Sequence, residues 1–60
     1  MYLFAGNYIN MNTDEKRSKT FEIDPQFFNS EKEVYQYAMG VAFEYKKYGE
    51  VFDSLEFIAG

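Results

Sequence analysis

The chain has 60 residues, of which 22% are aromatic and none is Cys or His, and its formal net charge is -4. A chain of this length forms one domain, residues 1–60, and buries only about 60% of the surface that its unfolded form exposes. The missing Cys and His exclude a disulfide framework and the common transition-metal sites. The acidic excess disfavours non-specific binding to nucleic acid or to an anionic membrane. We therefore expect no cofactor, no metal and no membrane contact.

The segment from Tyr2 to Met11 is rich in β-forming residues and predicts the first strand. Both of its faces are apolar, so this strand should be central in the sheet. One face is aromatic, with Tyr2, Phe4 and Tyr8, and Gly6 interrupts the alternation, which indicates a bulge or a close approach of another backbone. The other face is aliphatic, with Leu3, Ala5 and Ile9.

Asn10 to Lys19 is polar and charged, and predicts a long hairpin loop that contains the basic run KRSK. Thr20 to Asp24 then alternates cleanly, with Phe21 and Ile23 directed inward. This pattern predicts a second strand with one solvated face. Pro25 ends the strand, because proline cannot donate a hydrogen bond to a sheet.

Asp24 and Pro25 also suit the start of a single helical turn, with Asp24 as its cap. In that turn Phe27 and Phe28 would close the bottom of the core.

The main helix is predicted to begin at a capping box made by Ser30 and Glu33 and to end at Gly49 in a left-handed conformation. Lys46 and Lys47 would occupy its last turn, where positive charge suits the helix dipole. At about 100° per residue, one narrow stripe of this helix forms the core face. The stripe consists of Val34, Ala38, Val41, Tyr45 and Tyr48.

Val51 to Ala59 predicts the third strand, with Leu55 and Phe57 on one side and Phe52 and Ile58 on the other. The order is β-β-α-β, which predicts an α+β fold with a three-stranded, mainly antiparallel sheet. The economical layout places the first strand between the other two and packs the helix on one face.

Two apolar surfaces are left over and are the candidate interfaces. On the helix, Tyr35, Met39 and Phe43 follow one another at spacings of four, on a line that leaves the core stripe. They either lie over a sheet edge or contact another protein. On the sheet, the face opposite the helix would carry aromatic and aliphatic side chains, namely Tyr2, Phe4, Tyr8, Phe52 and Ile58. We expect association into a homodimer, either through this sheet face or through edge strands that pair across a two-fold axis.

No residue cluster matches a catalytic or cofactor-binding signature, and we expect a protein that is not an enzyme. The alternative to protein binding is association with nucleic acid through an aromatic sheet face and the basic Lys16, Arg17 and Lys19. The negative total charge and the adjoining Asp14 and Glu15 count against it. A small structural or assembly protein is the third hypothesis.

The chain resembles short, mostly uncharacterised accessory proteins encoded by phages and prophages of Gram-positive bacteria. The resemblance lies in the opening MYLFAGNYIN, the helix SEKEVYQYAMGVAFEYKKYGE and the close SLEFIAG. It implies a cytoplasmic protein that works by binding, as a modulator of a host protein or as an assembly factor. It implies no particular site residue.

Overall fold

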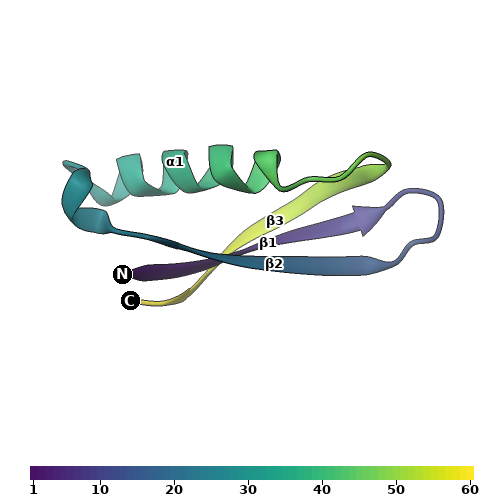
Figure 1. Ribbon diagram of the computed structural model, residues 1–60, viewed down its shortest axis with the longest axis horizontal. Coiled ribbons are helices and arrows are strands. Elements are labelled where there is room, and N and C mark those ends of the chain that lie inside the picture. The colour runs from purple at the N-terminus through teal and green to yellow at the C-terminus, as the bar shows by residue number, and fades with distance from the viewer.

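The computed structural model describes residues 1–60 and has the predicted α+β fold with the order β-β-α-β. Three strands form one antiparallel sheet in the order β2-β1-β3, so that the first strand is central as predicted (Figure 1). The elements are β1 (Tyr2–Asn10), β2 (Lys16–Ile23), a 3-10 turn (Pro25–Phe27), α1 (Glu31–Glu44) and β3 (Glu50–Ala59).

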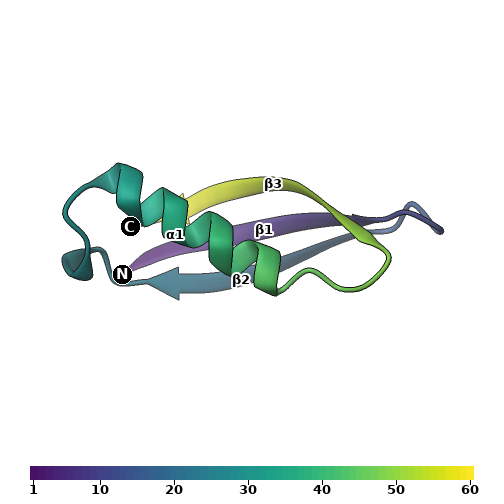
Figure 2. The same cartoon turned by 90° about the horizontal axis from the view of Figure 1, so that it is seen from above.

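Helix α1 packs on one face of the sheet and runs obliquely across the strands, from the β3 side at its beginning to the β2 side at its end (Figure 2). The core between helix and sheet is small, because the helix is the only element that covers the sheet. It contains Phe4, Phe21 and Ile23 from the strands and Val34, Ala38 and Ala42 from the helix.

Strand β2 begins at Lys16, so the basic run lies in a strand and not in the predicted loop. The reason is the length of β1, which pairs with β2 without interruption from Ile9 opposite Lys16 to Tyr2 opposite Ile23. Backbone pairing to a nine-residue partner outweighs the low β-propensity of a charged segment. The loop is only five residues long, and the Asn10 side chain accepts hydrogen bonds from two of its backbone N–H groups.

Both predicted helix starts are confirmed. The Asp24 carboxylate accepts a hydrogen bond of 3.1 Å from the backbone N–H of Gln26 and caps the 3-10 turn. Ser30 Oγ accepts from the N–H of Glu33 at 3.3 Å and caps α1. The Glu33 carboxylate in turn accepts from the N–H of Asn29 at 2.9 Å, one residue before the partner of a standard capping box.

The predicted end of the helix is wrong. Helix α1 stops at Glu44, with Tyr45 as its C-cap, and Gly49 adopts its positive φ of 87° in the turn into β3 instead. Tyr48 is fully exposed and Tyr45 is 42% exposed, so neither belongs to the core face. The predicted stripe is correct at Val34 and Ala38, whereas the buried residue of the last turn is Ala42, which lies outside that stripe.

Strand β3 is interrupted by two bulges, at Asp53 and Ile58, which have no partner in β1. The Asp53 bulge reverses the alternation and places Phe52 on the same face as Phe57, toward the helix. Regular alternation had put Phe52 on the opposite face. Gly6, where a bulge was one of the two readings, is regularly paired on both sides.

Gly6 is closely approached, but by a side chain and not by the backbone that the other interpretation of this position expected. A Cβ at Gly6 would lie 2.5 Å from the Tyr8 hydroxyl oxygen and 3.3 Å from Cβ of Ala42. The Tyr8 ring therefore lies over the bare backbone of Gly6, and its hydroxyl donates a hydrogen bond to the backbone carbonyl of Ala42. A residue without a side chain at position 6 is thus what lets β1 contact the last turn of α1.

Candidate interaction surfaces

Tyr35, Met39 and Phe43 form a continuous apolar row on the β3 side of α1, here called the ridge. Their exposed fractions are 41%, 38% and 51%. The Tyr35 ring packs edge-on against Phe4 with ring centroids 5.3 Å apart, and Phe43 lies over Phe52 at 4.9 Å. The ridge therefore lies over a sheet edge, which was one of the two predictions for these residues. Its three side chains still leave about two-fifths to half of their surface in solvent.

Phe57 of β3 lies near the ridge, because Phe57, at 5.6 Å, and Tyr35 both pack on the buried Phe4. Phe57 is 43% exposed. An aromatic side chain has about 150–250 Å² to bury, so the three half-exposed rings of Tyr35, Phe43 and Phe57 leave roughly 200–350 Å² in solvent. A patch of this size is comparable to the largest apolar patches of monomeric proteins, which are often functional.

The predicted aromatic open face of the sheet does not exist. Phe4 and Tyr8 are buried beneath α1, and Tyr2 and Phe52 lie half-buried on the same side. The two faces of β1 were correctly separated, but the helix covers the aromatic one. The register explains this choice, because Phe4 lies opposite Phe21 and Tyr2 lies opposite Ile23, which gathers the large side chains of two strands on one face.

The face of the sheet away from the helix is polar at its centre. The Asn7 side chain accepts a hydrogen bond from Ser18 Oγ at 2.6 Å and donates one to Ser54 Oγ at 3.0 Å, so that three short side chains join all three strands. A face built in this way offers no ring on which a nucleic-acid base could stack. The aromatic sheet face that the nucleic-acid hypothesis required is therefore not exposed.

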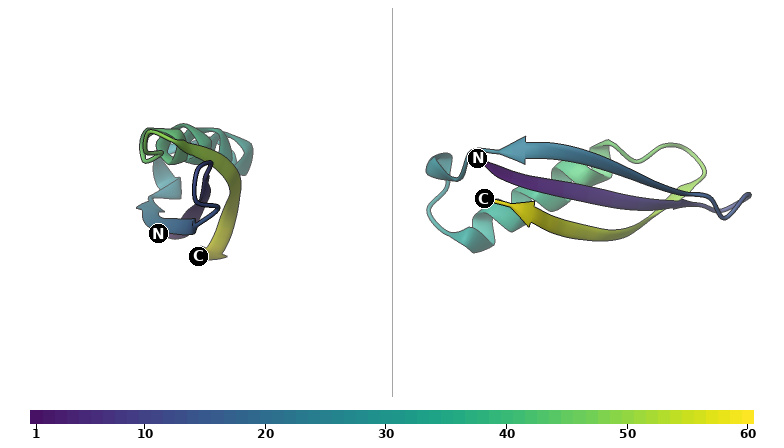
Figure 3. Two further views of the ribbon diagram at one scale, coloured as in Figure 1. Left: turned by 90° about the vertical axis from the view of Figure 1, so that its right-hand side faces the viewer. Right: turned by 90° about the horizontal axis from the view of Figure 1, so that it is seen from below.

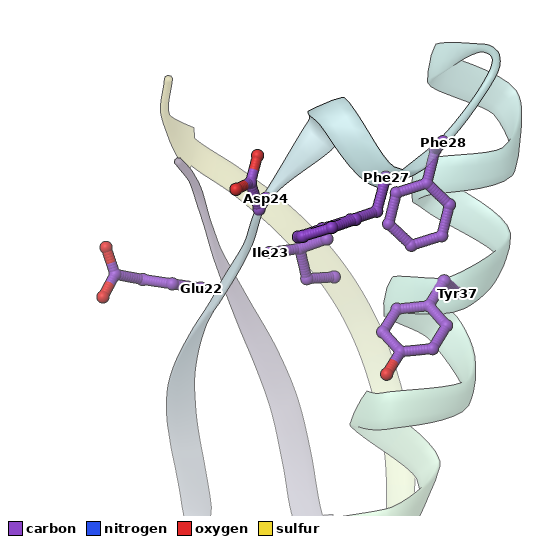
Figure 4. Close-up of a pocket in the computed structure, with 6 residues that line it drawn as sticks. All are labelled: Glu22, Ile23, Asp24, Phe27, Phe28 and Tyr37. Atoms are coloured by element: carbon purple, nitrogen blue, oxygen red, sulfur yellow. The ribbon is translucent and has the colours of Figure 1, made fainter.

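An apolar pocket of about 400 Å³ lies on the opposite side of the helix, over the end of β2 (Figure 4). Ile23, Phe27, Phe28 and Tyr37 surround it, whereas the Glu22 side chain points away. Phe28 is half-buried and packs on Tyr37 at 5.3 Å, but Phe27 is 79% exposed and does not close the core as predicted. The oblique helix leaves this corner of the sheet uncovered, since α1 lies nearer β3 where it begins.

A polar network holds the end of α1 on the sheet. The Arg17 guanidinium donates to both carboxylate oxygens of Glu50, at 2.9 and 2.8 Å, and to the backbone carbonyl of Tyr45 at 2.9 Å. It also lies 4.5 Å from the centre of the Tyr8 ring. Carbonyl groups at the end of the helix thus receive side-chain donors from the sheet, which explains why the helix stops at Glu44. The backbone N–H of Lys47 completes the network by donating to Glu50 at 2.8 Å.

The ionisation of this network is fixed by its hydrogen bonds. The Arg17 guanidinium lowers the pKa of the Glu50 carboxyl to about 2, with a further contribution from the N–H of Lys47. The same pairing raises the pKa of Arg17, and burial raises the pKa of the Tyr8 hydroxyl. Near neutral pH Glu50 and Arg17 are therefore ionised and Tyr8 remains a hydrogen-bond donor. Arg17, Glu50 and Tyr8 bond to one another or to the end of the helix, which indicates a structural role. We call this network the clasp.

The sequence did not anticipate the clasp or the contribution of Phe57. Arg17 and Glu50 are separated by 33 positions, and no local pattern marks a pair at that distance.

Comparison with protein-family models, with curated proteins and with solved structures gives no match for the chain. The one α-helix is too short and too polar to cross a membrane.

Proposed function

We propose that the protein is a non-enzymatic protein-interaction module that docks an apolar surface of a partner protein on the ridge of Tyr35, Met39 and Phe43. The exposure of the ridge carries this proposal. The core-facing side of α1 is already filled by Val34 and Ala38, which are at most 1% exposed, so the ridge is additional apolar surface. Side chains of this kind, fixed on a helix, are typical anchors of protein interfaces.

The ridge is rigid, and rigidity favours specific docking. The helix is capped by Ser30 at its start and held by Tyr8 and Arg17 at its end. Two of the three ridge side chains also rest on sheet residues, so little conformational entropy is lost when they are covered. The partner expected for such a ridge is a protein with an apolar groove. A host protein modulated by a phage or prophage accessory protein would fit the resemblance described above.

The experiment is affinity capture with tagged protein from a lysate of the native host, followed by mass spectrometry. Wild type is compared with Met39→Glu and with Phe43→Ser, which place a charge and a polar group on the ridge. Tyr48→Ser is the matched control, because Tyr48 is an exposed aromatic residue outside the ridge. Circular dichroism checks that each variant is folded, since Phe43 also packs on Phe52.

The proposal expects a protein that wild type and Tyr48→Ser retain and that both ridge variants lose by at least about tenfold, the effect of removing one anchor. The same ranking should hold with the purified partner. Equal capture by all four proteins would reject the ridge as the docking site.

A further inference from the structure

Strand β2 has an outer edge that no part of the chain pairs with. The strand is terminal in the sheet, and none of the turn, loop and cap hydrogen bonds of the backbone involves a residue of β2. Toward the hairpin, β2 lies on the side of β1 that faces away from α1, whereas β3 rises to the helix (Figure 1). Seen from below, β2 forms one complete margin of the sheet (Figure 3). The backbone groups of this edge therefore have no partner within the chain.

The geometry of β2 suits the addition of a strand. Its eight residues pair with β1 in one uninterrupted register, so that the outward N–H and C=O groups follow at regular spacing. Strand β3, the other margin, is broken by the bulges at Asp53 and Ile58. Bulges twist an edge and protect it against pairing. Of the two edges, only β2 is a continuous template.

The charges along β2 identify the strand that would fit it. Lys16 lies at the hairpin end of β2 and Glu22 lies near its other end, with Asp24 just past the strand. Lys19 is directed to the helix, where its Nζ lies 5.3 Å from the centre of the Tyr45 ring. Arg17 is already neutralised by Glu50, in the only ion pair of the structure. When a strand with this pattern pairs with a copy of itself in antiparallel orientation, the basic end of each copy meets the acidic end of the other. Opposite charges on facing positions stabilise antiparallel pairs.

The same operation at β3 would be unfavourable. Its exposed charged side chains past the first residue are Asp53 and Glu56, both acidic. A two-fold axis would bring these like charges together across the new pair, which destabilises it. The like charges and the bulges therefore both disfavour pairing of β3 with a second copy.

We propose that two copies of the protein pair their β2 strands about a two-fold axis near Thr20, which makes one continuous six-stranded antiparallel sheet. Lys16 of each copy then lies within reach of Glu22 and Asp24 of the other. The two helices lie on the same face of that sheet. This dimer is independent of the proposed partner docking, because the ridge lies on the β3 side and stays free.

The dimer also accounts for the exposed corner at the end of β2. In an antiparallel pair, the hairpin of the second copy extends past Asp24 toward Phe27 and the apolar pocket. The hairpin carries Met11, whose side chain is largely exposed. Pairing of the strands would therefore bring two exposed apolar groups near each other, one from each copy.

The experiment is sedimentation over a concentration series, with a reciprocal charge exchange. Lys16 and Glu22 are exposed and lie opposite Ile9 and Leu3 of β1, so their replacement leaves the fold intact. We expect wild type to reach twice the monomer mass. Lys16→Glu and Glu22→Lys should each weaken dimerisation by about tenfold or more, because each replaces the attraction between positions 16 and 22 by repulsion, twice in the two-fold pair. The double variant restores opposite charges at these two positions and should recover most of the dimerisation, since only the contact with Asp24 stays repulsive.

Glu56→Lys is the matched control, since it makes the same change of charge on the edge strand β3. It should leave dimerisation unchanged. A wild-type mass that stays monomeric at every concentration would overturn the proposal. So would a dimer that tolerates all three β2 variants, and a loss in Met39→Glu alone would then assign self-association to the ridge. None of these results depends on capture of a host partner, so each proposal can fail without the other.

Discussion

The two edge strands of the sheet differ in how they are protected. Strand β3 carries two bulges and two exposed carboxylates, one at the Asp53 bulge and one at Glu56 between the bulges, and it lies beneath the ridge of the helix. Strand β2 is regular and carries charges of both signs, and its Arg17 and Lys19 side chains contact Tyr45 at the end of α1. A single oblique helix on a twisted sheet therefore protects the two margins unequally. The helix side of β3 is suited to docking and the edge of β2 to pairing.

Matched truncations of the two phenylalanines that flank Phe4 should show the largest difference between the edges. Phe21 of β2 is buried and stacks on Phe4 at 5.9 Å, whereas Phe57 of β3 is 43% exposed. Phe21→Ala should lower the free energy of unfolding by about 3–5 kcal/mol, and Phe57→Ala by about half as much. Urea unfolding of both variants measures this. Equal losses would mean that β3 is bound to the core as firmly as β2.

The Arg17–Glu50 pair joins the two edge strands across β1, and acid should weaken this link. The pKa of Glu50 falls from 4.5 to about 2 on folding, mainly through its hydrogen bonds with Arg17. The stabilisation is therefore complete above about pH 4.5 and is lost as the pH falls toward about 2. Thermal unfolding across this range should show a smaller loss in Glu50→Gln than in wild type. Glu56→Gln, at an exposed position of the same strand, should keep the wild-type slope.

The smallest effects are expected on the polar face of the sheet, where the two edges are nearly equivalent. Ser18 and Ser54 each make one hydrogen bond with Asn7, from β2 and from β3 respectively. Ser18→Ala and Ser54→Ala should each lower the free energy of unfolding by about 0.5–1 kcal/mol. The two values, from urea unfolding, should agree within error. A much larger loss at Ser18 would show that β2 depends on this face more than its core contacts indicate.

Local chemistry was enough to predict the elements of the fold. The caps at Asp24 and Ser30 were correct because a capping side chain bonds to backbone groups two or three positions away. The order of the strands was correct because β1 is apolar on both faces, which only a central strand tolerates here. The ridge was correctly placed outside the core stripe, since that placement follows from helix periodicity alone.

Long-range contacts caused the errors. The start of β2 at Lys16 depends on the length of its partner strand, and the end of α1 depends on hydrogen bonds with Tyr8 and Arg17 from two strands. The side of the sheet on which Phe52 lies depends on a bulge at Asp53, and no residue type in β3 predicts that bulge. In each case the deciding group lies far away in the sequence, where periodicity and propensity carry no information.

The elements, their N-terminal caps, their order and the two apolar faces of β1 can be derived from the sequence, because they follow from periodicity and from bonds between near neighbours. Which of those faces the helix covers depends on the tertiary structure. The tertiary structure also decided that Phe4 and Tyr8 are core residues, and that Tyr35, Met39 and Phe43 remain exposed over β3. The physical reason is that burial of an amphipathic element depends on the register of its neighbours, and that register is set between strands and not within them.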